Sequence, residues 1–254
     1  MNKIRMPVDI AMTLLSIILM GGNYLFPLDI VHEILGVALF VLWGIHIALN
    51  RRWYASLAPG KLITSANAND RRAYGAIFKG KYNPYRVMQT VINCGILICT
   101  IFLMTSGIIL SNHVFTFLNI QRGLGFARIA HLLASHWYYL FMSLHIGLHI
   151  GMIANKICHP KTVSGSPSEE MSKQVCHDKL RKILPRILLA LACAYGIYSF
   201  IARRVWKYLI LKQQFFFFDL ERGYILFAID YISIIILFAT LSHLFAKRLK
   251  KNKL

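Results

Sequence analysis

Apolar residues are gathered into six runs along the chain, and a polar or basic segment follows each run. A run of about 20 apolar residues has the length of an α-helix that crosses the hydrocarbon core of a bilayer. The pattern therefore predicts an all-α, polytopic membrane protein with about six transmembrane helices. The predicted spans are residues 8–26, 29–50, 87–110, 127–153, 187–201 and 223–245.

The segments between these runs suggest a division of the chain into three parts. Residues 51–86 and 154–186 are predicted to be basic loops, residues 111–126 a polar connector, and residues 203–222 an amphipathic segment at the membrane interface. We expect a four-helix membrane domain (1–155), a cytoplasmic basic loop (156–186) and a two-helix C-terminal membrane extension (187–254).

The distribution of Lys and Arg along the chain predicts its orientation in the membrane. The chain has 29 Lys and Arg against 10 Asp and Glu, and 22 of the 29 basic residues lie in the two termini and in the loops 51–86 and 154–186. Cytoplasmic segments of membrane proteins carry such an excess. We therefore predict a multi-pass protein of the bacterial cytoplasmic membrane with both termini in the cytoplasm. The same distribution favours contact with lipid headgroups and argues against nucleic-acid binding.

Histidines recur at one interval in two of the predicted spans. His32 and His46 are 14 residues apart in the second span, and His131 and His145 are 14 residues apart in the fourth. Fourteen residues at about 100° each return to nearly the same side of a helix, roughly 21 Å further along it. An ionisable side chain inside a membrane helix costs free energy, and its presence by default indicates a functional site.

The matched intervals predict two sites that each hold one metal macrocycle between two imidazoles. His32 and His131 would bind the outer haem iron, and His46 and His145 the inner one. His136 and His149 are alternates, although their 13-residue separation places them about 220° apart around the helix, so that both cannot face one bundle axis. His149 is a candidate to replace His145, to bond a haem propionate or to face a quinone. The alternative for all six histidines is that they are polar residues packing helices.

Small and charged residues near the histidines are candidates for the surroundings of a haem. Glycines beside the ligands would leave room for a porphyrin, although by themselves they are better explained by ordinary close packing of membrane helices: Gly36, Gly44, Gly147 and Gly151. Arginines near the membrane faces are candidate contacts for haem propionates: Arg51, Arg52, Arg122 and Arg128. Glu33 is predicted either to orient His32 or to complement a helix N-terminus.

Other chemistry is less well supported by the sequence. There is no H-E-x-x-H motif of a zinc protease, no C-x-x-C-H motif for covalent haem attachment and no nucleotide-binding fingerprint. Cys158-His159 and Cys176-His177 are weak candidates for zinc. Asp230, inside the last span, is interpreted either as part of a proton path or as a member of an ion pair.

Three segments together resemble a known family. HEILGVALFVLWGIHIALNRRW, a span containing TSG, and HLLASHWYYLFMSLHIGLH are similar to the flavinylation-associated cytochromes, which are small bacterial membrane b-type cytochromes. The resemblance covers about residues 8–155. It implies bis-histidine ligation of two b-type haems, electron transfer across the cytoplasmic membrane and extracytoplasmic flavin-carrying partners.

The resulting prediction is an electron-transfer component rather than a self-contained enzyme. Electrons would arrive from a quinol or a separate dehydrogenase, which makes a quinone a further candidate cofactor. Two other classes stay open: a quinone-reactive membrane anchor subunit of an oxidoreductase complex, and a haem-free transporter or scaffold that uses membrane histidines and Asp230 for protons.

Overall fold

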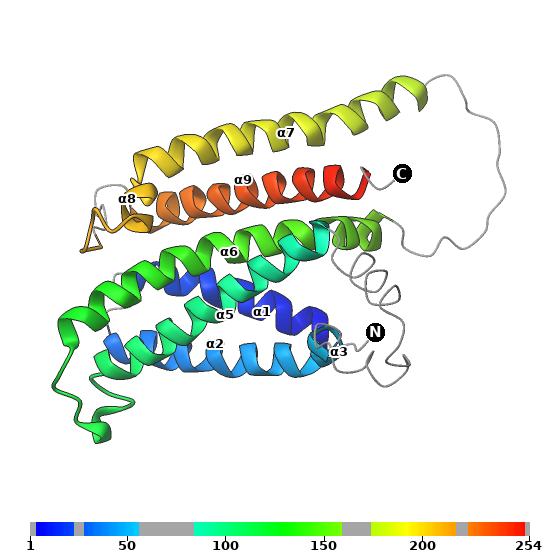
Figure 1. The fold of residues 1–254 in the computed structure, drawn as a ribbon. Coiled ribbons are helices and arrows are strands. Elements are labelled where there is room, and N and C mark those ends of the chain that lie inside the picture. Colours follow the sequence, from blue (N-terminus) through cyan, green and yellow to red (C-terminus); the bar gives the residue numbers. More distant parts are fainter. Residues whose placement is uncertain (1–3, 23–27, 56–83, 159–173, 217–222, 252–254) are drawn as a thin grey trace, which may run out of the picture. The chain divides into compact units, whose positions relative to one another are not determined.

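The computed structural model describes residues 4–22, 28–55, 84–158, 174–216 and 223–251, and every regular element in these ranges is a helix (Figure 1). The predicted all-α class is thus confirmed for the described chain. The helices are α1 (Arg5–Met20), α2 (Asp29–Leu49), α3 (Arg51–Ala55), α5 (Pro84–Leu110), the 3-10 turn η3 (Thr116–Leu118), α6 (Leu124–Cys158), α7 (Gln174–Ala202), α8 (Val205–Leu209) and α9 (Gly223–Lys251).

Within the described ranges, four helices are long and apolar enough to cross a membrane: Asp29–Leu49, Pro84–Leu110, Leu184–Ala202 and Gly223–Lys250. They coincide with four of the six predicted spans and make this a membrane-embedded protein. The 16 residues of α1 extend only about 24 Å, less than a hydrocarbon core of about 30 Å. The 35 residues of α6 are long enough, but four histidines among them make this helix more polar. The count of six spans stays a prediction.

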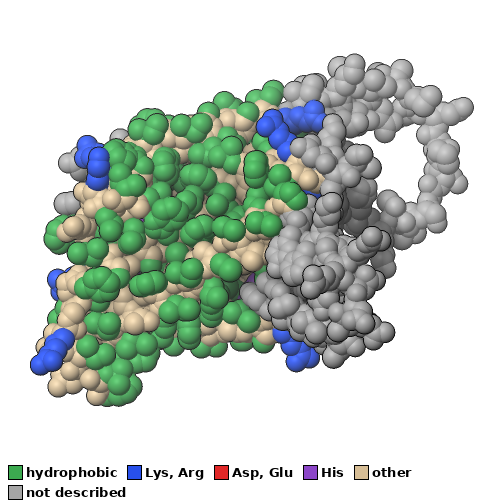
Figure 2. Space-filling view, viewed as in Figure 1, with side chains coloured by type: hydrophobic (Ala, Val, Ile, Leu, Met, Phe, Trp, Pro, Cys, Tyr) green, Lys and Arg blue, Asp and Glu red, His purple; other side chains and the backbone are tan. Residues whose placement is uncertain are grey.

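The lateral surfaces of the helices are apolar. Ile98, Leu191 and Ile225 are exposed, together with many other large hydrophobic residues. Figure 2 shows hydrophobic side chains over the sides of the helices and Lys and Arg near their ends. Contiguous apolar surface of this kind is unfavourable in water and is suited to contact with lipid tails.

Two compact units divide the chain, and the boundary falls inside α6. The first unit is Met1–Tyr139 with Gln214–Phe218, and the second is Leu140–Gln213 with Asp219–Leu254. In the first, α1 and α2 form an antiparallel hairpin and α5 packs against α2 (Figure 1). The Arg5 guanidinium donates to the Leu49 carbonyl at one end of this hairpin. The Ser16 hydroxyl lies 3.1 Å from that of Tyr138, which ties α1 to α6.

In the second unit, α7 and α9 lie side by side along most of their length (Figure 1). Gly196 permits this approach, because a Cβ there would lie 2.5 Å from the Ser233 carbonyl oxygen. Gly147 of α6 is packed in the same way against the backbone carbonyl of Ala239. Gly147 therefore serves helix packing against α9, the favoured one of the two interpretations of this glycine.

All four predicted connecting segments contain helix: 51–86 includes α3, and 111–126 includes η3. The segment 154–186 is helical at both ends, since α6 continues to Cys158 and α7 begins at Gln174. Lys and Arg favour helices and are excluded only from the membrane core, so charge indicates where the bilayer ends rather than where a helix ends. In the segment 203–222, α8 follows the left-handed residue Arg204 (φ 52°) and buries Val205 and Tyr208.

Candidate functional site

Two of the predicted ligands come together in the first unit. His32 stands in the first turn of α2 and His131 in the second turn of α6, and their ring centres are 6.3 Å apart with an interplanar angle of 62°. When two imidazoles bind one metal from opposite sides, with metal–nitrogen bonds of about 2 Å, their ring centres lie roughly 6 Å apart. The separation of the two rings fits a bis-imidazole metal site.

The partner of His131 favours the tautomer that such a site needs. The His131 Nδ1 atom lies 3.0 Å from the hydroxyl oxygen of Ser106 on α5. That hydroxyl has a single proton and donates it to the Phe102 carbonyl at 2.6 Å. Its oxygen is therefore left to accept a hydrogen bond from Nδ1–H of His131. This assignment leaves the lone pair on Nε2, the nitrogen that would bind a metal.

The Nδ1 atom of His32 is buried and has no hydrogen-bond partner among the described residues. A metal bound at Nε2 would not supply that partner, so the fit of a haem rests on the two rings and on the bond between His131 and Ser106. Gly107, next to Ser106, lies beside His131, because a Cβ built there would be 3.8 Å from Cε1 of the ring, an ordinary van der Waals contact. The separation of the two rings and the tautomer of His131 are the features that fit a haem between His32 and His131.

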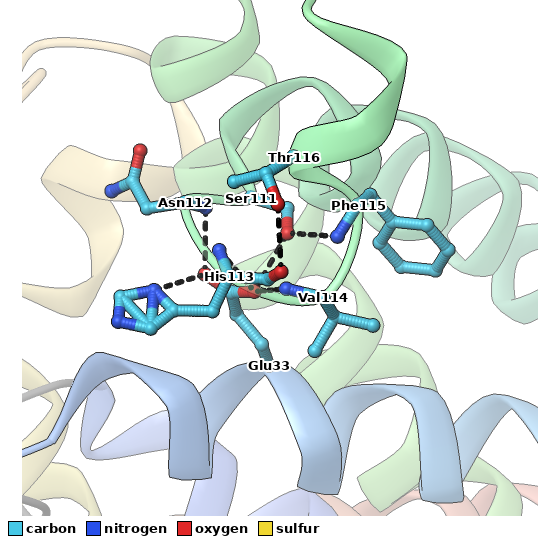
Figure 3. Close-up of polar contacts among 7 residues, drawn as sticks. All are labelled: Glu33, Ser111, Asn112, His113, Val114, Phe115 and Thr116. Atoms are coloured by element: carbon cyan, nitrogen blue, oxygen red, sulfur yellow. Dashed lines mark hydrogen bonds and ion pairs between the residues drawn. The ribbon is translucent and has the colours of Figure 1, made fainter.

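Glu33 binds the loop between α5 and α6 (Figure 3). Its carboxylate accepts from the Ser111 hydroxyl at 2.6 Å and from the backbone N–H groups of Asn112 and Val114, each at 2.8 Å, and of His113 at 3.2 Å. Within the described chain, its hydrogen bonds all go to this loop. Glu33 thus fixes the end of α5 and the approach to α6 over the first turn of α2. It makes no bond to the imidazole of His32, the first of the two roles considered for it.

His46 is held by α1. Its Nδ1 atom lies 2.7 Å from a carboxylate oxygen of Asp9. The Asn50 side-chain amide donates to the His46 carbonyl at 2.8 Å, and its nitrogen lies 3.4 Å from Nε2 of the ring. Asp9 was not among the functional residues predicted from the sequence. The signal was a carboxylate in an apolar run, and the antiparallel hairpin of α1 and α2 identifies its partner.

The remaining histidines of α6 fall on both sides of the unit boundary. His145 and His149 belong to the second unit, one turn apart, with ring centres separated by 4.7 Å. The pairing of His46 with His145 rests on the sequence interval, because the two residues belong to different units. His136, in the first unit, is 1% exposed; its Nδ1 atom lies 2.8 Å from the Leu132 carbonyl and its ring 6.3 Å from that of Phe216.

The candidate propionate contacts are at helix ends. Arg51 and Arg52 begin α3 directly after α2, and Arg128 lies in the first turns of α6; all three are exposed. Gly36 and Gly44 have no other group within 4 Å of a built Cβ, whereas the surroundings of Gly151 lie outside the described side chains. The structure therefore leaves the roles predicted for these residues open.

Asp230 is the centre of a polar cluster in the second unit. Its side chain is 5% exposed and accepts hydrogen bonds from the Tyr195 hydroxyl at 2.6 Å, from the Ser199 hydroxyl at 3.0 Å and from Nε of Arg203 at 2.7 Å. The guanidinium of Arg203 also lies over the ring of Phe227, 5.7 Å from its centre. Of the two interpretations offered for Asp230, the structure shows the ion pair.

Metal chemistry beyond the histidine pairs finds no support in the described part of the chain. No group of three or more His, Cys, Asp or Glu residues that could hold a metal ion occurs there. The Cys158-His159 and Cys176-His177 pairs lie outside the side chains that the structure describes. A haem site needs only two protein ligands, since the porphyrin supplies the others.

The chain was compared with known protein families, proteins and structures. No protein-family model, no curated protein and no solved structure matches this chain. We therefore infer function from the residues and contacts described above.

Proposed function

We propose that this chain is a transmembrane b-type cytochrome that moves electrons across the bacterial cytoplasmic membrane through two haems. The observation that carries the proposal is the pair His32 and His131, with ring centres 6.3 Å apart in a membrane-embedded helical unit. The outer haem is assigned to this pair. The inner haem is assigned to His46 and His145, with His149 as the alternate on the same face of α6 and His136 as a further alternate.

Each part of the chain has a distinct task in this proposal. A bound haem supplies the one-electron chemistry, and the protein sets its ligands, position and surroundings. His32 and His131 hold the outer group, while Ser106 keeps His131 in the tautomer that presents Nε2. The 14-residue interval on α2 separates the two sites by roughly 21 Å along the helix, so that one lies in each leaflet.

The helix ends would complete the two sites. Propionates are carboxylates, and Arg51, Arg52 and Arg128 present guanidinium groups at the ends of helices, where such groups would emerge. The absence of a nucleotide-binding fingerprint in the sequence argues that electrons come from a quinol or from another protein rather than from NAD(P)H.

The proposed direction and partners follow from charge and resemblance. The basic residues at both termini and in the segments 51–86 and 154–186 favour a cytoplasmic location for these parts. The resemblance to flavinylation-associated cytochromes suggests extracytoplasmic flavin-carrying proteins as acceptors. Electrons would then pass from the inner site to the outer one.

A reduced-minus-oxidised absorption spectrum of the purified chain, with haem quantified per polypeptide, tests the proposal. We expect two b-type haems per chain and the low-spin spectrum of bis-imidazole ligation. A colourless protein after expression with ample haem supply would contradict the proposal and favour a haem-free transporter or scaffold. Stoichiometric co-purification of a soluble catalytic subunit would instead favour a quinone-reactive anchor.

A further inference from the structure

The Glu33 carboxylate joins the start of α2 to the loop between α5 and α6, called here the α5–α6 loop (Figure 3). It accepts one hydroxyl and three consecutive backbone N–H groups from this loop, and its side chain is only 14% exposed. Hydrogen bonds to an ionised acceptor are about twice as strong as neutral ones, and consecutive backbone N–H groups form a concave site for an anion. The contact is therefore strong for a link between two segments of the chain.

Helix packing does little to fix α2 against α6. No residue of α2 is buried, and among the described helices α2 packs against α1 and α5 and makes few contacts with α6. The ring of His32 on α2 nevertheless lies 6.3 Å from that of His131 on α6. The separation of these two rings therefore depends on a link other than direct packing between their helices.

The Glu33 contact supplies this link. Glu33 follows His32 directly in the sequence, and the loop that it binds connects α5 to α6. Ser106, whose hydroxyl meets Nδ1 of His131, lies near the end of α5, just before this loop. We infer that Glu33 is a positioning residue of the outer site, which sets the separation and the mutual angle of His32 and His131 by holding the α5–α6 loop on the start of α2. This inference rests on the proposed function.

Ser111 offers a way to weaken the contact without changing the charge beside the outer site. Its hydroxyl donates to Glu33 at 2.6 Å, and its oxygen accepts from the Phe115 N–H at 2.9 Å. Ser111→Ala removes both bonds and leaves the carboxylate in place. Glu33→Gln is the stronger change, because a single amide oxygen has two lone pairs and cannot accept all four hydrogen bonds. It also removes the negative charge, which Ser111→Ala does not.

Electron paramagnetic resonance of the oxidised haem tests the inference, because the spectrum of a low-spin ferric haem with two imidazole ligands depends on the angle between the ligand planes. In a His46→Ala background, which should keep only the outer haem, Glu33→Gln and Ser111→Ala should both change this spectrum, and Glu33→Gln should change it more. A shifted reduction potential in Glu33→Gln, with parent spectra in both variants, would show that Glu33 acts through its charge alone. That result would overturn its positioning role.

Hydrogen exchange of the backbone amides, followed by mass spectrometry, gives a readout that needs no haem. Both variants should exchange faster than the parent at residues 112–114, while exchange in α1 and α9 stays at the parent level and shows that the variants fold. Gln121→Ala removes a different bond of the same connector, the one to Asn119, and should change neither the spectrum nor the exchange at 112–114.

The two readouts together separate the inference from the proposed function. Faster exchange at 112–114 with an unchanged spectrum, or unchanged exchange in Glu33→Gln, would overturn the positioning role of Glu33 and leave the proposed function standing. A parent chain without haem would overturn both.

Discussion

Replacing His131 with alanine should reduce the haem content from two per chain to one. His131 is the residue whose ring lies 6.3 Å from that of His32 and whose tautomer Ser106 fixes. Without His131, only His32 would be left to hold a haem at the outer site, whereas the residues assigned to the inner site would be unchanged. His32→Ala should give the same result. The measurement is haem per polypeptide, together with the reduced spectrum of the haem that remains.

A histidine at the same end of the first unit provides the control. His113 is exposed and lies in the loop that Glu33 binds, with Nδ1 3.9 Å from the Glu33 carboxylate. His113→Ala should keep both haems, because this loop residue lies beside the carboxylate of Glu33 on α2 rather than in the pair of ligands. Retention of two haems in both His32→Ala and His131→Ala would mean that this pair packs helices and binds no metal.

Replacing Asp230 with alanine should destabilise the chain by about 3 kcal/mol or more, the cost found when one partner of a buried ion pair is removed. The change leaves the guanidinium of Arg203 without its carboxylate, and that side chain is 10% exposed. It also deprives the Tyr195 and Ser199 hydroxyls of their acceptor. The free energy of unfolding in mixed micelles, measured with a denaturing detergent, is the test.

A paired replacement separates an ion pair from a proton path at Asp230. Asp230→Leu combined with Arg203→Met removes both charges and should recover most of the stability, with unchanged haem content and electron transfer. Wild-type stability in Asp230→Ala with a loss of electron transfer would contradict the structural role. It would point to proton movement through this carboxylate.

The positions of the histidines were predictable because helical periodicity is a local rule. The matching 14-residue intervals on two helices singled out His32 and His131 as one of two candidate pairs, and the structure brings these two rings together. The apolar runs predicted four of the helices that can span a membrane for the same reason. Positions within one helix follow from the sequence alone.

Contacts between helices were harder to predict. Asp9 and His46 are 37 residues apart, so their bond depends on the angle at which α1 and α2 pack. Glu33 binds backbone N–H groups nearly 80 residues further along, and a backbone group leaves no mark in the sequence. For Gly147, close packing and room for a cofactor require the same residue type, and only its position against Ala239 distinguishes the two.

The basic segments led to a different error, because part of what was predicted to be loop is helical. Residues 174–186 contain several Lys and Arg and were predicted to be loop, yet α7 begins at Gln174 and runs through Pro185. Hydropathy reports where the lipid ends, and a helix that continues into the aqueous phase keeps its hydrogen bonds there. The same limit applies to α6, which is helical to Cys158.

Transmembrane electron transfer in proteoliposomes tests the central claim most directly. The chain is reconstituted into vesicles that enclose an impermeant oxidant, a reductant is added outside, and reduction of the enclosed oxidant is followed by absorbance. We expect the parent chain to reduce the oxidant well above the rate of protein-free vesicles, and His32→Ala and His46→Ala to fall to that background rate, because each lacks one of the two haems. Equal rates in the parent and in both variants would contradict the two-haem path.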